Sequence, residues 1–107
     1  MSTVSSRVLL FIRHATSTEA KCREAAADEV TDWASGSSPA VCGLLAGVLA
    51  IAAAHEPDDA ALEAQLNALL QLSEFLDPEI AVHLEDIDKA SHPAVLGEYV
   101  RDLLGHY

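Results

Sequence analysis

The sequence predicts an all-α fold of about six helices, arranged as three antiparallel hairpins in one domain over residues 1–107. The first observation is composition: 50% of the residues are hydrophobic but only 5% are aromatic, and alanine and leucine dominate, which favours helices over sheets. The second is periodicity, because apolar residues recur at helical spacing between short polar turns. The third is the length, which allows one domain with a modest core.

The first predicted hairpin extends from Ser5 to about Ala34. The apolar run Val8–Ile12 fits a buried strand or a buried helix, and the helical context favours a helix. After a turn at residues 16–18, a second helix is expected from about Glu19 to Ala34. Its apolar stripe has spacings of 4, 4 and 3 residues, which is typical of one helix face: Cys22, Ala26, Val30 and Trp33. We expect Trp33 to close the core, although tryptophan is also frequent in binding hot spots.

The segment Pro39–Ala54 contains no charged residue. Ser38 is a suitable N-cap, and Pro39 suits the first helical position. A helix without a polar face is expected to be surrounded, and this run is shorter than the roughly 20 residues that span a bilayer. We therefore predict a central buried helix of a soluble domain. Gly43 and Gly47 share one face, where we expect the closest approach of another helix.

Three further helices are expected in the second half of the chain. One begins at Asp58 or Asp59 and extends to about Leu76. The next begins at Pro78, with Asp77 as its N-cap, and the last ends before Gly105. The buried stripe of the last two consists of Ile80, Leu84, Ile87, Leu96, Tyr99, Val100, Leu103 and Leu104.

The three pairs resemble HEAT repeats, in which an apolar helix, a turn containing Asp and Pro, and a second helix with an arginine form one unit. The segment from Leu84 to Gly105 carries the closest local resemblance, and the second helices recur after 40 and then 33 residues. The resemblance implies a short α-solenoid. An irregular helical bundle is the alternative.

Charge is the most unusual property of the chain. It has 17 acidic and 6 basic residues and a net charge of −11, and no Lys or Arg occurs between Arg23 and Lys89. The intervening residues include fourteen acids, so we expect a negative surface that repels nucleic acid and anionic membranes and attracts basic proteins. The alternative is that the charge serves only solubility.

These features resemble small acidic bacterial immunity proteins and antitoxins. The resemblance implies a non-enzymatic inhibitor, without a cofactor, that neutralises a basic toxin or nucleic-acid-binding enzyme. The contact is expected on seven acids: Asp28, Asp32, Glu63, Glu74, Glu85, Asp86 and Asp88. The absence of a signal-like segment predicts a cytoplasmic location, and we expect a monomer or weak homo-oligomer. A helical adaptor that binds an apolar peptide or helix near Leu72, Phe75 and Tyr99 is the alternative function.

The sequence signals for a catalytic site, a metal site or a disulfide bond are weaker. The run Leu9-Leu-Phe-Ile-Arg-His-Ala-Thr16 resembles the opening of the histidine phosphatases, which would make His14 a nucleophile and Arg13 a phosphate ligand. No metal site is expected, because the histidines do not assemble three or four ligands at suitable spacing: His14, His55, His83, His92 and His106. Two cysteines are too few for a disulfide framework, although a single Cys22–Cys42 bridge stays open.

Overall fold

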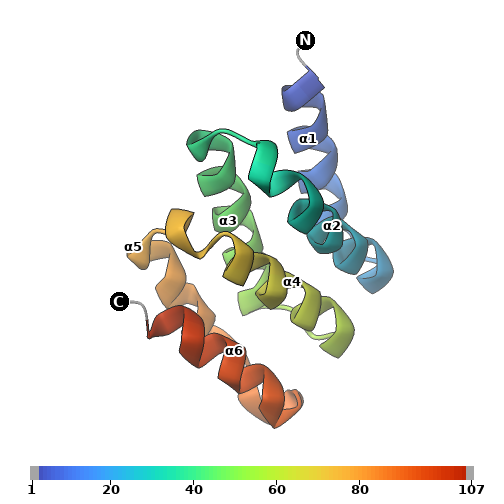
Figure 1. Cartoon of the computed structure of the whole chain (residues 1–107). Helices are drawn as coiled ribbons and strands as arrows, with labels where there is room; N and C mark the ends of the chain where they lie inside the picture. The colour runs from blue at the N-terminus through green and yellow to red at the C-terminus, as the bar shows by residue number, and fades with distance from the viewer. Residues whose placement is uncertain (1–2, 106–107) are drawn as a thin grey trace.

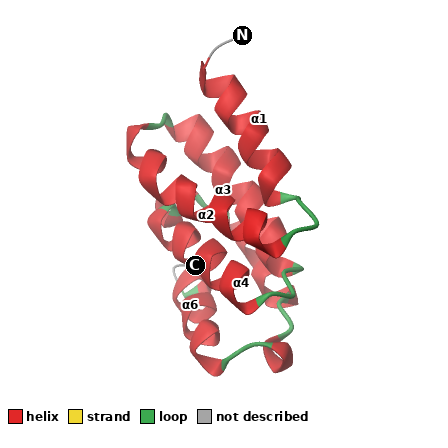
Figure 2. Ribbon diagram, turned by 90° about the vertical axis from the view of Figure 1, so that its right-hand side faces the viewer, coloured by secondary structure: helices red, strands yellow, loops and turns green. Residues whose placement is uncertain are grey.

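The computed structural model describes residues 3–105, and every regular element in that range is helical (Figure 1). The α-helices are α1 (Thr3–Ala15), α2 (Ala20–Trp33), α3 (Pro39–Ala54), α4 (Asp59–Gln71), α5 (Pro78–Ala81) and α6 (Ala94–Leu104). Short 3₁₀ turns lie between them: η1 (Ala34–Gly36), η2 (Ser73–Phe75), η3 (Val82–Asp86) and η4 (Lys89–Ser91). The predicted all-α fold of six helices is confirmed. Loops are confined to the turns (Figure 2).

Local signals set several helix starts. The Ser38 hydroxyl accepts a hydrogen bond from the Val41 N–H at 3.3 Å, and Pro39 is the first residue of α3. A carboxylate of Asp58 accepts from the Ala61 N–H at 2.9 Å and caps α4. Each such side chain satisfies an N–H that would otherwise lack a partner in the first turn. The predicted bounds of α3 are therefore reproduced.

The end of α4 and the form of the fifth helix differ from the prediction. α4 ends at Gln71 rather than near Leu76, and the chain continues as η2. The fifth helix is a single α-turn followed by η3. Ala81, Leu84 and Ile87 are all buried and lie three residues apart, which matches the three residues per turn of a 3₁₀-helix. Core packing thus overrides the α-helical geometry that the sequence pattern suggested.

The hairpins form two layers. The first contains α1, α3 and α5 with η3, and α3 packs against both of the others. The second contains α2, α4 and α6, in which α4 packs against both neighbours. The three hairpins follow one another along the molecule from the N-terminus to the C-terminus (Figure 1). The core lies between the layers and is dominated by leucines with at most 1% exposure: Leu45, Leu49, Leu62, Leu66, Leu69, Leu72, Leu84 and Leu103.

The central helix α3 is only partly enclosed. Leu45 and Leu49 on its inner side are buried, but Leu44 and Ile51 are 47% and 42% exposed. The prediction that α3 is surrounded on all sides is therefore wrong. The first layer has no third layer above it, so the outer side of α3 stays open. No helix among the described residues is long and apolar enough to cross a membrane.

Candidate functional site

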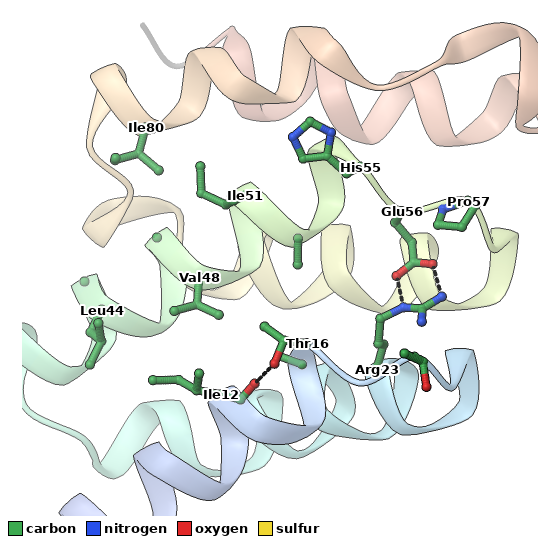
Figure 3. Close-up of a pocket in the computed structure, with 15 residues that line it drawn as sticks. Ile12, Thr16, Arg23, Leu44, Val48, Ile51, His55, Glu56, Pro57 and Ile80 are labelled. Carbon is green, nitrogen blue, oxygen red and sulfur yellow. Dashed lines mark hydrogen bonds and ion pairs between the residues drawn. The ribbon is translucent and has the colours of Figure 1, made fainter.

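An apolar groove runs along the outer side of α3. Its volume is about 910 Å³. Ile12 of α1 forms one wall and Ile80 of α5 the other (Figure 3). Between them, α3 contributes the floor: Gly43, Leu44, Gly47, Val48, Ile51 and Ala52. We call this surface the groove; the charged side chains that line it, Arg23 and Glu56, lie at one end and pair with each other.

The two glycines of α3 face this groove and not a neighbouring helix. A Cβ atom on Gly43 would meet the Phe75 carbonyl oxygen at 3.9 Å, which is an ordinary contact, and one on Gly47 would meet nothing within 4 Å. The prediction of a tight helix contact at this pair is therefore wrong within the described chain. The missing side chains instead deepen the groove between α1 and α5.

A buried ion pair forms one end of the groove. The Arg23 guanidinium donates from Nε and Nη2 to the two carboxylate oxygens of Glu56, at 2.7 and 2.8 Å (Figure 3). Glu56 also accepts from the Asp58 N–H at 3.1 Å and from the Gln65 amide at 2.9 Å. Burial by itself would raise the pKa of the Glu56 carboxyl, but the hydrogen bonds from Arg23, Asp58 and Gln65 together hold that pKa below its usual value.

The same pair joins the turns of the three hairpins. The Nη1 of Arg23 donates to the Ser17 carbonyl in the first turn at 2.9 Å. In the third turn, the His92 ring lies 3.0 Å from the Glu56 carbonyl through Nε2 and 2.7 Å from the Asp59 carboxylate through Nδ1. These contacts connect elements that are distant in sequence. The network therefore has a structural role at the ends of the helices. The sequence pattern had placed Glu56 among the fourteen acids of an expected negative surface and did not predict this role.

The seven acids predicted to bind a partner are all exposed, but they do not form one face. Asp28 of α2 and Glu63 of α4 lie together at a shallow depression of about 270 Å³. Glu24, Asn67 and Tyr99 line it as well, together with Ala60 and Ala64. We call this surface the acidic depression. No Lys or Arg side chain lines it.

The other five acids lie elsewhere. Asp32 lines a separate depression beside Arg7 and Trp33, where the Arg7 guanidinium carbon is 4.6 Å from the centroid of a Trp33 ring. Glu74 belongs to η2, and Glu85 and Asp86 belong to η3. Asp88 caps η4, and a hydrogen bond from the Ser91 hydroxyl at 2.6 Å lowers the pKa of its carboxyl.

The residues expected to bind an apolar partner do not line the groove. Leu72 is 1% exposed, and Phe75 and Tyr99 pack partly buried against the core. The groove residues escaped prediction because Ile12, Leu44 and Ile51 have the same apolar character as true core residues. Only the placement of the three hairpins shows which of them stay uncovered.

The resemblance to histidine phosphatases is not supported locally. The segment with Arg13 and His14 is the end of α1 and not a strand. Both cysteines are free thiols, with Cys42 buried and Cys22 half-buried, so the bridge that the sequence left open does not form. Among the described residues no group of three or more His, Cys, Asp or Glu side chains could hold a metal ion; His106 lies outside them.

Searches for similar proteins gave no match: no family model, curated protein or solved structure matches this chain.

Proposed function

We propose that this chain is a non-enzymatic, cytoplasmic inhibitor of a basic protein, of the kind that immunity proteins and antitoxins represent. The contact surface is the acidic depression. One observation carries the proposal: two packed helices, α2 and α4, bring Glu24, Asp28 and Glu63 to one surface that no Lys or Arg lines. The free thiols of Cys22 and Cys42 fit a reducing compartment.

The physical basis is electrostatic complementarity on a rigid frame. Carboxylates on packed helices keep their separation, so a partner's Lys and Arg side chains meet a fixed pattern of charge. A net charge of −11 also accelerates the encounter with a basic protein. Tyr99, half-buried at the edge of the acidic depression, supplies the kind of side chain that often dominates binding energy.

The test begins with affinity capture from the source cells and continues with the purified partner. Calorimetric titration compares the parent chain with the triple variant Glu24→Gln, Asp28→Asn, Glu63→Gln. The matched control removes three exposed acids outside the acidic depression: Glu74→Gln, Glu85→Gln and Asp86→Asn. Both variants have the same net charge, so a difference between them reports position and not total charge.

We expect the first variant to weaken binding at least tenfold, about 1.4 kcal/mol, and the control to change it much less. Binding by the parent chain should weaken strongly between about 0.05 M and about 0.5 M salt. The captured protein should also lose its own activity when the chain is added. Equal losses in both variants, or salt-independent binding, would contradict the proposal.

A further inference from the structure

The groove exposes apolar side chains that no part of the described chain covers. Leu44 and Ile51 project from α3 with 47% and 42% of their surface exposed, and the charged side chains that line the groove, Arg23 and Glu56, are paired with each other. Contiguous apolar surface of this kind usually marks an interaction site. The charges beside the groove indicate which partner it fits.

The two flanks of the groove have opposite charge. On one side, α1 carries Arg13, next to Ile12 in the chain, and no acidic residue, whereas Arg7 of the same helix stacks on Trp33 away from the groove. On the other, α5 and η3 carry Glu79, Glu85 and Asp86 and no Lys or Arg. Figure 3 shows the groove between these flanks, with Ile12 on the α1 side and Ile80 on the α5 side.

We propose that the groove is covered by a second copy of this chain, related by a two-fold axis that lies in the interface and runs roughly along α3. In a two-fold interface the same surface faces itself. The α3 helices of the two copies then face each other, and the basic α1 of each copy lies over the acidic α5 and η3 of the other. The favourable charge contact forms twice.

A foreign helix fits this surface less well. A basic helix in the groove would be attracted along α5 but repelled along α1. An acidic helix would be attracted along α1 but repelled along α5. The second copy satisfies both flanks at once. Gly43 and Gly47 also acquire a role, because the absence of side chains there lets the two α3 backbones approach closely.

This interface uses the first layer, whereas the acidic depression lies on α2, α4 and α6 of the second. The dimer therefore leaves both acidic depressions free, and the inference stands independently of the proposed function. Each copy has a net charge of −11, so long-range repulsion opposes association at low salt. Because added salt screens this repulsion and the interface centre is apolar, the dimer should persist as salt rises.

The experiment is sedimentation equilibrium of the full chain over a concentration series. We expect a reversible species of twice the 11.3 kDa chain mass. Ile51→Asp should raise the dimer dissociation constant at least tenfold. The matched control is Val95→Asp on α6, because Val95 is similarly exposed, at 53%, but lies in the other layer. Circular dichroism checks that each variant is folded.

Two further variants keep the test decisive if Ile51→Asp unfolds. Gly47→Gln adds a side chain on the groove side of α3, where a Cβ atom meets nothing within 4 Å, and should also raise the dissociation constant. Arg13→Glu and Glu79→Lys should each weaken the dimer. The double variant should restore it, because the exchanged charges on α1 of one copy and α5 of the other would again be opposite in sign. A foreign partner would not produce this rescue.

A chain that stays monomeric up to its solubility limit would overturn the inference and leave the groove to a different protein. So would equal effects of Ile51→Asp and Val95→Asp, or a charge-swapped double variant no better than either single change. Failure of the proposed function would look different, because it would affect binding of the captured basic protein and leave the dimer intact.

Discussion

Replacing Arg23 with alanine is expected to destabilise the chain by about 3 kcal/mol, because it leaves a buried carboxylate without its cation. The Glu56 side chain is 1% exposed and that of Arg23 15%. The change removes two hydrogen bonds to Glu56 and a third to the Ser17 carbonyl. The free energy of unfolding of a domain is about 5 to 15 kcal/mol, so this loss is a large fraction of the total stability. The melting temperature should fall by roughly 12–18 °C.

A second substitution separates the charge from the lost packing. Glu56→Gln in the parent chain should cost about 1–3 kcal/mol, because both carboxylate oxygens accept from N–H donors and the amide replaces one of them with an NH2 group that cannot accept. In the Arg23→Ala background the same change should be stabilising, since it removes the unpaired buried charge. Urea unfolding followed by circular dichroism measures all four proteins. If Glu56→Gln destabilises both backgrounds equally, the ion pair does not have the energetic role assigned to it.

The pH dependence supplies an independent check. The pKa of Glu56 in the folded chain lies below its ordinary value of 4.5, so its contribution to stability is present above that value and is lost as the pH falls through the folded pKa. Removing Arg23 takes away a main cause that lowers the pKa of Glu56 and leaves burial opposed only by the hydrogen bonds from Asp58 and Gln65, so that pKa should rise. The deficit of Arg23→Ala should therefore shrink between about pH 7 and about pH 4. An unchanged deficit would contradict the assigned cause.

Three further predictions concern packing and exposure. Gly47→Ala should stabilise the monomer by about 0.5–1 kcal/mol, because its Cβ meets nothing within 4 Å in the same chain and alanine favours the helix; urea unfolding at a concentration where the chain is monomeric would show a loss if the site were tightly packed within the chain. Leu66→Ala should cost about 3 kcal/mol, because Leu66 is fully buried between the layers, and a loss below about 1 kcal/mol would place it outside the core. A thiol reagent should label Cys22 in the folded chain and Cys42 only after unfolding, since Cys42 is 1% exposed; equal labelling rates would contradict these burials.

The predicted binding residues show what the positions of charged residues in the sequence can and cannot predict. The sequence correctly placed all seven acids on exposed positions, because Asp and Glu are rarely buried without a partner. It did not show that Asp28 and Glu63 share a surface with Glu24, since that depends on the packing of α2 against α4. Glu56 was the exception among the acids, buried because Arg23 from another helix neutralises it.

The sequence by itself determined the helical class, the extent of α3 and the caps at Ser38 and Asp77, and it narrowed the cap of α4 to Asp58 or Asp59, because these depend on interactions within a few residues. Only the tertiary structure decided which apolar residues lie inside. Leu44 and Leu45 are neighbours of the same type, yet one lines the groove and the other is fully buried. Periodicity cannot separate them in a helix that is apolar all round, because burial there depends on how many neighbouring helices cover it. The other helices of the stacked hairpins pack against the inner side and both flanks of α3, and they leave its outer side open.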